Sequence, residues 1–259
     1  MITNMIVKFK EKLKKSPVIG LFSKTIDPSF IECIGFSGFD FVIIDIEHGP
    51  VSLENAQNLV RAAQISNVLP IIRVRENSFN LISAYLDIGA GGIQVPHVKK
   101  AKDIKKILEY AKFFPRGKRG ICKFVRAADY SSVPKESFFE KSNEIIIAIQ
   151  LEGKEAIANL DEILNVEGYD ILFIGPYDLS QSLGIPGQVD HPLVEDKILE
   201  IIEKCKKKKI IVGIFTDKIE DTLKWFKLGV KYLSYSVDVG IFYESCKTIL
   251  KKIMSSIEI

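Results

Sequence analysis

The 259-residue sequence lacks most features that mark secreted, membrane-spanning and metal-finger proteins. It has only four cysteines, and no two of them have the spacing of a zinc or redox motif, so we expect free thiols in a reducing compartment. No segment approaches the roughly 20 apolar residues of a membrane span. The first residues also lack the apolar stretch of a signal peptide. These absences exclude a disulfide scaffold and predict a soluble, cytoplasmic protein with no membrane partner.

An excess of charge of one sign is also missing. The chain has 36 Lys and Arg against 33 Asp and Glu, a formal net charge of +3. This balance does not provide the electrostatic footprint of a nucleic-acid-binding protein. The basic run at 206–209 is interpreted as a solvated helix end. With 47% hydrophobic and 27% charged residues, the composition is that of an ordinary globular protein and excludes disorder.

Short apolar runs rich in β-branched residues recur along the chain, and most are followed by a segment with helical spacing of its apolar residues. There are eight such runs: Val18–Phe22, Phe39–Ile46, Pro70–Val74, Gly92–Val95, Glu144–Leu151, Tyr169–Ile174, Ile210–Phe215 and Lys231–Ser236. Continuous apolar strands alternating with helices indicate a parallel sheet covered by helices. No G-x-G-x-x-G follows the first run, which argues against a dinucleotide-binding fold. We therefore predict an α/β protein in which residues 1–259 form a single (β/α)₈ barrel domain.

Polar residues follow several of these runs directly. Catalytic side chains of (β/α)₈ barrels lie at the carboxyl ends of the strands, so these residues are expected to converge on one mouth. They are Asp45, Glu47 and His48 at the end of the second run, Arg73 at the end of the third, Gln150 and Glu152 at the end of the fifth, and Tyr177 and Asp178 after the sixth. Because burying such groups without partners is costly, their position indicates a functional site.

Residue type suggests a role for each group. Glu152 and Asp178, with Gln150 beside them, provide the oxygen ligands that suit Mg²⁺ or Mn²⁺. Asp178 could instead cap a helix. Arg73 would bind an anionic oxygen of the substrate or of an enolate, or else form a structural ion pair with an acidic residue of the second strand end.

The histidines are treated separately. His48 lies three residues beyond Asp45, which could orient its ring to make an acid–base pair, although a turn residue is the alternative. His97 and His191 are assigned structural roles. No lysine is expected at a strand end in a position to form a Schiff base, so covalent catalysis is disfavoured.

Two further features are placed away from the expected mouth. Asp87 precedes the fourth strand, so it belongs at the opposite end of the barrel and would reach a site only across a subunit interface. The long irregular excursion 114–139 carries five basic residues, which either bind an anionic substrate or solvate the loop: Arg116, Lys118, Arg119, Lys123 and Arg126.

Taken together, these motifs resemble those of the HpcH/HpaI family of metal-dependent class II pyruvate aldolases, over essentially the whole chain. The motifs that carry the resemblance are Gly38–Phe41 leading into Asp45–His48, Pro70–Arg73, Leu86–Ala90 with Val95–Pro96, Arg119–Gly120, Gln150–Glu152 and Phe173–Ser180. The resemblance implies a barrel of the phosphoenolpyruvate/pyruvate type, commonly a homo-hexamer whose final helix is exchanged between subunits. It further implies carbon–carbon lyase activity that joins or separates a pyruvate-type enolate and an aldehyde.

The same resemblance implies roles for individual residues. Glu152 and Asp178 would hold a divalent metal (Mg²⁺ or Mn²⁺), which chelates the small anionic keto-acid substrate. The backbone around Tyr177 and Asp178 would bind the substrate carboxylate. Arg73 would stabilise the enolate oxygen, while His48 with Asp45 would move the proton of the aldol hydroxyl. Supporting groups near the metal would be Glu47 and Gln150, and Asp87 would be contributed by a neighbouring subunit.

Some segments depart from the common family pattern. Ile46 and Cys122 stand where many members have glycine. The runs 119–127 and 235–238 are similar to a subset of the family, citrate synthases of siderophore biosynthesis, which condense oxaloacetate with acetyl-CoA without a metal. That activity is the alternative function. A catalytically silent, anion-binding barrel is a third alternative, which the intact set of polar residues at the strand ends disfavours.

Overall fold

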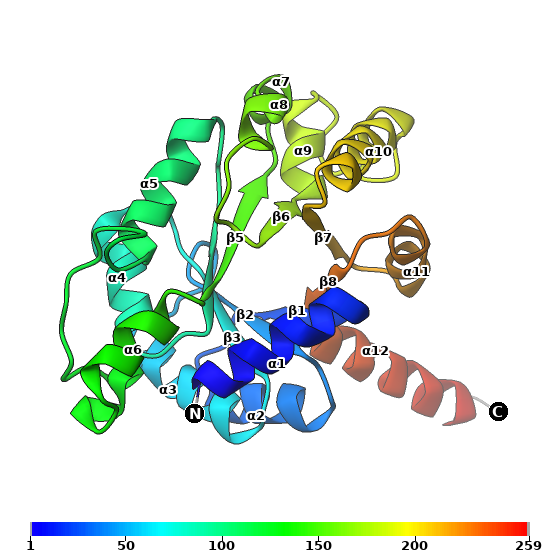
Figure 1. Cartoon of the computed structure of the whole chain (residues 1–259). Coiled ribbons are helices and arrows are strands. Elements are labelled where there is room, and N and C mark those ends of the chain that lie inside the picture. Colours follow the sequence, from blue (N-terminus) through cyan, green and yellow to red (C-terminus); the bar gives the residue numbers. More distant parts are fainter. Residues whose placement is uncertain (1, 258–259) are drawn as a thin grey trace.

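The computed structural model describes residues 2–257 and contains a closed barrel of eight parallel strands (Figure 1). Each strand pairs with the next along the chain, and β8 pairs with β1. The strands are β1 (Val18–Ser23), β2 (Phe41–Asp45), β3 (Leu69–Arg73), β4 (Gly92–Val95), β5 (Ile146–Leu151), β6 (Ile171–Ile174), β7 (Ile211–Thr216) and β8 (Tyr232–Val237). The predicted (β/α)₈ barrel is confirmed.

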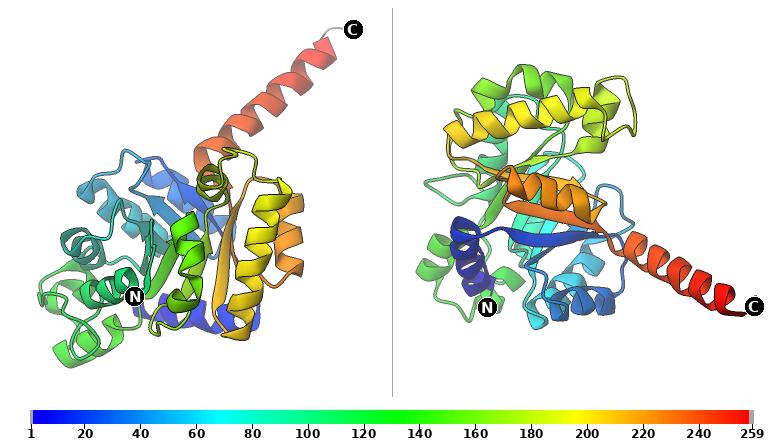
Figure 2. Two further views of the ribbon diagram at one scale, coloured as in Figure 1. Left: turned by 90° about the horizontal axis from the view of Figure 1, so that it is seen from above. Right: turned by 90° about the vertical axis from the view of Figure 1, so that its right-hand side faces the viewer.

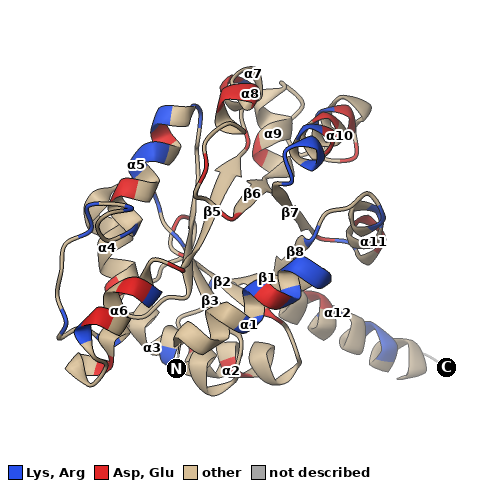
Figure 3. Cartoon of the chain, in the orientation of Figure 1, with Lys and Arg blue, Asp and Glu red and all other residues tan. Residues whose placement is uncertain are grey.

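Helices surround the barrel and follow the strands, as the apolar periodicity predicts. They are α1 (Ile2–Lys15), α2 (Pro28–Phe36), α3 (Leu53–Ile65), α4 (Phe79–Asp87), α5 (Ala101–Ala111), α6 (Lys135–Ser142), α7 (Lys154–Ala158), α8 (Leu160–Ile163), α9 (Pro176–Ser182), α10 (Pro192–Lys207), α11 (Ile219–Lys227) and α12 (Asp238–Ile257), with a short 3₁₀ helix η1 (Arg126–Ser131). Charges of both signs are spread over these helices (Figure 3). None of the helices described is long and apolar enough to cross a membrane.

The core is aliphatic and continuous with the barrel. All residues of β2, β3, β4, β5 and β6 are buried, which explains why these strands read as unbroken apolar runs rather than alternating ones. The amino-terminal end of the barrel is closed by α1, whose Phe9 packs edge-on against Phe41 and Tyr232 at the starts of β2 and β8. The opposite, carboxyl end is therefore the one available for a site.

The excursion at 114–139 is less irregular than predicted. It contains η1 and the start of α6, and it is anchored by a small aromatic cluster of Phe113, Ala128 and Phe138. The sequence signal was weak here because α6 has only eight residues and a polar surface. Packing of the aromatic residues, rather than local periodicity, orders this segment.

The last helix leaves the barrel. Figure 2 shows α12 projecting from the body of the molecule, with its carboxyl end far from every other element. Its outer turns carry four apolar residues whose relative solvent exposure is 45% or more: Ile249, Leu250, Ile253 and Met254. Such a row of exposed apolar side chains is typical of a surface that is covered by another chain.

Candidate active site

The carboxyl ends of β2 and β3 bring an acidic and a basic residue face to face. The register pairs Asp45 with Arg73 across the two strands. Arg73 donates from Nε to Asp45 Oδ1 at 3.0 Å and from Nη2 to Oδ2 at 2.8 Å, while its guanidinium lies over the Phe22 ring. Burial alone raises the pKa of the Asp45 carboxyl, but the bonds and charge of Arg73 outweigh it, and the pKa is lowered. The two residues form a bidentate ion pair in which Asp45 is fully buried and Arg73 is 9% exposed.

Glu47 adds a second carboxylate to this arrangement. Its Oε2 lies 3.0 Å from Arg73 Nη1, and its side chain is 7% exposed. Burial is the main cause that raises the pKa of Glu47, and the neighbouring charges of Asp45 and Asp178 act in the same direction. Arg73 thus faces two acidic residues at once. It forms the ion pair with the second strand end that the sequence analysis gives as an alternative role for this residue.

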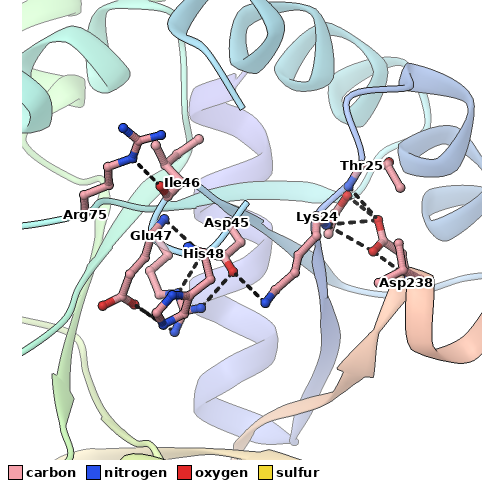
Figure 4. Close-up of polar contacts among 11 residues, drawn as sticks. Lys24, Thr25, Asp45, Ile46, Glu47, His48, Arg75 and Asp238 are labelled. Atoms are coloured by element: carbon pink, nitrogen blue, oxygen red, sulfur yellow. Dashed lines mark hydrogen bonds and ion pairs between the residues drawn. The ribbon is translucent and has the colours of Figure 1, made fainter. Parts of the chain in front are cut away.

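His48 lies at the rim of the mouth with its ring 58% exposed. The sequence suggested that Asp45 orients this ring. In the structure, Asp45 Oδ1 accepts instead from the backbone N–H groups of Glu47 and His48, at 3.1 and 3.3 Å (Figure 4). The carboxylate nearest to the ring belongs to Glu47, whose Oε2 is 3.9 Å from His48 Nε2. The Asp45 side chain therefore stabilises the turn that carries His48 and forms the ion pair with Arg73.

A chain of amides leads to Glu152, which directly follows β5. Gln94 of β4 donates from Nε2 to Gln150 Oε1 at 2.6 Å, and Gln150 Nε2 donates in turn to Glu152 Oε2. All three residues are at least 95% buried. Burial raises the pKa of Glu152, against the effect of these hydrogen bonds. The amides fix the position of a carboxylate that would otherwise be costly to bury.

His97, to which the sequence analysis gives a structural role, lies beside the candidate metal ligand Glu152 in the structure. It follows β4 after Pro96, and its ring lies between two buried carboxylates: Nδ1 is 2.8 Å from Glu152 Oε1, and Nε2 is 3.0 Å from Glu47 Oε1. Its backbone N–H also donates to Glu152, at 2.9 Å. With φ of +57°, it adopts a left-handed conformation that is strained for a residue with a side chain, a feature common at functional sites. Its position just beyond a strand end was the available signal. His191, in contrast, has the expected structural role and caps α10.

Asp178 and Tyr177 lie in the first turn of α9. Asp178 is exposed, and it does not cap the helix, because Gly175 occupies the N-cap position. The Tyr177 hydroxyl donates to Asp217, and burial together with this bond raises the pKa of Tyr177 to about 12. Both residues line a cavity of about 300 Å³ at the carboxyl end of the barrel, with His48, Arg73 and Gln150 among the other lining residues.

A lysine also lines this cavity, contrary to the expectation that none lies at a strand end. Lys24 directly follows β1, and its Nζ is 3.6 Å from Asp45 Oδ2. The predicted strand ended at Phe22, one residue before the observed end, so Lys24 was not recognised as a strand-end residue. As an ammonium beside a buried carboxylate, it is placed to bind anions rather than to act as a nucleophile.

Asp87 lies at the end of α4, on the side of the barrel away from the mouth, as predicted. Within the chain it pairs with Arg119, whose side chain is 1% exposed. Three other basic residues of the excursion also have polar partners: Arg116 pairs with Glu144, Lys118 pairs with Glu109, and Arg126 donates to Gln64. Among the residues that line the cavity at the mouth, none comes from the excursion.

The residues around Glu152 fit a hard divalent cation. Glu152 and Asp178 offer carboxylate oxygens and are close enough for the charge of each to act on the other. Gly175 leaves space beside them, since a Cβ there would lie 3.0 Å from Glu152 Oε2. Two carboxylates, with water and substrate completing the shell, are a usual arrangement for Mg²⁺. No group of three or more His, Cys, Asp or Glu side chains in the described chain forms a complete cage, so the substrate would have to supply ligands.

Comparison with known proteins agrees with this architecture. Residues 18–245 match the model of the HpcH/HpaI aldolase/citrate lyase family. A 2-keto-3-deoxy-L-rhamnonate aldolase of Escherichia coli K12 is 33% identical over 243 residues, which cover 92% of this chain and 89% of the relative.

Two solved structures are close in three dimensions. An HpcH/HpaI family protein from Burkholderia cenocepacia J2315 superposes with a TM-score of 0.91 at 25% identity, covering 95% of this chain and 99% of that one. The citrate synthase SbnG superposes with a TM-score of 0.88 at 32% identity, covering 96% and 98%.

Proposed function

Because this chain belongs to the HpcH/HpaI aldolase/citrate lyase family and is an enzyme of carbon–carbon bond chemistry, we propose that it cleaves and forms 4-hydroxy-2-oxo acids. The substrate would separate into pyruvate and an aldehyde, as expected of a 2-keto-3-deoxy acid aldolase. The observation that carries the proposal is the convergence of Glu152, Asp178, Arg73 and His48 on one end of the barrel.

The proposed cleavage proceeds through four events. The 4-hydroxyl group loses a proton, the bond between C3 and C4 breaks with release of the aldehyde, and the electron pair forms the enolate of pyruvate. That enolate then takes a proton at C3. We assign the hydroxyl proton to His48, whose exposed ring at the rim can exchange it with water.

Arg73 would stabilise the negative charge that develops on the enolate oxygen. Its guanidinium is held rigid by Asp45, Glu47 and the Phe22 ring, and it still lines the cavity. A donor that is fixed before the reaction stabilises developing charge without reorganisation. Asp45 is thus a positioning residue for Arg73, and Gln150 is a positioning residue for Glu152.

Glu152 and Asp178 would hold the divalent ion, Mg²⁺ or Mn²⁺. When bound, such an ion supplies a Lewis acid for the keto and carboxylate oxygens of the substrate. Tyr177 and Asp178 border the same cavity, so the backbone of this turn would contribute to carboxylate binding.

Exchange of the pyruvate methyl protons in D₂O, followed by NMR, tests this function without knowledge of the aldehyde. We expect exchange with added Mg²⁺ and its loss in excess EDTA, because enolisation is common to every pyruvate aldolase. Exchange that persists in metal-stripped protein with EDTA would contradict the metal-dependent mechanism. No exchange under either condition would contradict the aldolase function itself.

One observation favours a second candidate function, the condensation of oxaloacetate with acetyl-CoA to citrate. His97 contacts both Glu47 and Glu152, so its ring lies between two of the carboxylates that surround the position proposed for the metal. A similar overall structure, SbnG, is a citrate synthase. Glu47 and Glu152 therefore each have a polar partner within the chain when no ion is bound.

Thiol release from acetyl-CoA distinguishes this second function. A citrate synthase releases CoA only when oxaloacetate is present and continues to do so in EDTA. We expect the His97→Met variant to lose this metal-independent release by at least about 10²-fold, the usual contribution of an acid–base group. His191→Ala, which removes a helix cap that does not line the cavity, is the matched control and should leave the rate unchanged. Absence of thiol release from the native protein would exclude this candidate.

We further propose that the single domain 1–259 acts as a homo-oligomer, a hexamer by resemblance, in the cytoplasm. The exposed apolar side chains of α12 support exchange of this helix with a neighbouring subunit. In such an assembly, Asp87 would approach the mouth of a second barrel together with Arg119. The cytoplasmic assignment is supported by its four free thiols.

A further inference from the structure

Lys24 is the one cationic side chain of the cavity to which the proposed mechanism gives no role. It comes from the end of β1, while Glu152 and Asp178 come from the ends of β5 and β6. In a closed barrel with the strand order β1 to β8, β1 and β5 lie on opposite sides. A ligand that reaches from the carboxylates to Lys24 must therefore cross the mouth.

The backbone of Lys24 is fixed by a clamp from the other end of the chain. Asp238, at the start of α12 and 5% exposed, accepts from the Lys24 N–H at 3.1 Å and from Ser23 Oγ at 2.6 Å (Figure 4). The Thr25 N–H also approaches Asp238, at 3.4 Å. Because the clamp uses backbone groups of Lys24, the side chain remains free while its origin is held in place. Pre-organisation of this kind lowers the entropy cost of binding.

The ammonium of Lys24 has capacity for a ligand that Arg73 lacks. Arg73 uses Nε and Nη2 on Asp45, and its Nη1 faces Glu47. Lys24 Nζ, in contrast, is 3.6 Å from Asp45, which is an ion-pair distance but too long for a hydrogen bond. Within residues 2–257, Nζ makes no side-chain hydrogen bond, so its three donors are available, and its side chain is 32% exposed toward the cavity.

We propose that Lys24 binds a second carboxylate of the substrate, so that the site selects dicarboxylic 2-oxo acids of the oxaloacetate type over pyruvate. This rests on the proposed assignment of the cavity to a 2-oxo acid. The first carboxylate and the keto group lie on the β5–β6 side, and the distal carboxylate meets the ammonium on the β1 side. Lys24 is thus a specificity-determining residue of the site.

Paired ligands that differ by one carboxylate test the proposal by titration calorimetry: oxaloacetate against pyruvate, and malate against lactate as a pair that does not decarboxylate. In the native protein the dicarboxylate binds more tightly. We expect Lys24→Met to weaken dicarboxylate binding about tenfold, equivalent to 1.4 kcal/mol, with less than a twofold change for the monocarboxylates. Lys24→Arg, which retains the charge, should keep most of the preference.

A matched control is available in Lys99, which follows β4 and pairs with Glu155 on the surface. Lys99→Met should alter neither pair of ligands. The proposal is overturned if Lys24→Met weakens both ligands of a pair equally, if it changes neither, or if the native protein binds oxaloacetate no more tightly than pyruvate. Failure of the proposed function has a different signature: pyruvate methyl exchange would be absent while the Lys24-dependent preference for dicarboxylates remained.

Discussion

Replacing Arg73 with Met is expected to reduce kcat for aldol cleavage by about 10²–10³-fold, the usual effect of removing one pre-organised donor to a developing negative charge. It also deprives Asp45, which is fully buried, and Glu47 of the guanidinium that pairs with both. Breaking a buried ion pair by removing one partner costs about 3–5 kcal/mol of the free energy of unfolding. Steady-state kinetics and urea unfolding measure the two effects separately.

Arg75 provides the control for this variant. It lies two residues beyond Arg73 and is exposed, and among the described residues its side chain donates only to the Ile46 carbonyl, at 2.7 Å. Arg75→Met should therefore leave kcat near the native value and cost far less stability. Arg73→Lys, which keeps the charge but not the paired N–H donors, should fall between the two. A near-native kcat for Arg73→Met would remove Arg73 from the mechanism.

Arg73→Met should also change how the free energy of unfolding responds to acid. The pKa of Asp45 is lowered, because Arg73 outweighs the effect of burial. A carboxyl with a lowered pKa adds stability above its unfolded value of about 3.9, and this stability is lost as the pH falls through the folded-state pKa. Arg73→Met removes the cause of the lowering, so its unfolding free energy should fall less between neutral and acidic pH than that of the native protein.

Loss of the metal ligands is the second change with a large expected effect. Glu152→Ala and Asp178→Ala should each abolish metal-dependent exchange of the pyruvate methyl protons. This loss is larger than the ~10–100-fold decrease that is typical when a group that only supports a metal ligand is removed. Treatment with EDTA should reproduce both variants. Isothermal titration with Mg²⁺ or Mn²⁺ would show directly whether binding is lost.

The two variants should differ in stability. Glu152 accepts hydrogen bonds from the Gln150 amide and from the His97 backbone, so its removal leaves buried donors unpaired. Asp178 is exposed and makes no side-chain hydrogen bond to any other residue of the range 2–257. Glu152→Ala should therefore lower the unfolding free energy while Asp178→Ala does not. Glu155→Ala, a surface carboxylate on α7, should change neither activity nor stability, and full exchange in either ligand variant would refute the proposed metal site.

The order of the strands and the residues at their ends follow from local features of the sequence. Unbroken apolar runs such as 146–151 are needed because both faces of a barrel strand are buried, and this pattern is visible without coordinates. Consecutive strands pair in a closed barrel, so a polar residue at a strand end is placed at the mouth by its position alone. Arg73, Glu152 and Asp178 could be identified in this way.

The partner of each polar side chain depends on the tertiary structure. The choice of Asp45 between Arg73 and the His48 ring was decided by the strand register and by a turn in which Asp45 accepts backbone N–H groups. The left-handed backbone of His97 turns its ring between two carboxylates, and no pattern in one sequence reports a positive φ at a histidine.

The position of Lys24 depends on a contact between the two ends of the chain. Its backbone is held by Asp238, more than 200 residues further along the chain. The sequence by itself determined the barrel, the mouth and most of the residues that surround it, because these depend on periodicity and on neighbouring strands. Only the tertiary structure decided which charges are paired and which remain available to a substrate. Pairing depends on differences of a few tenths of an ångström in the distance between side chains that are far apart in sequence.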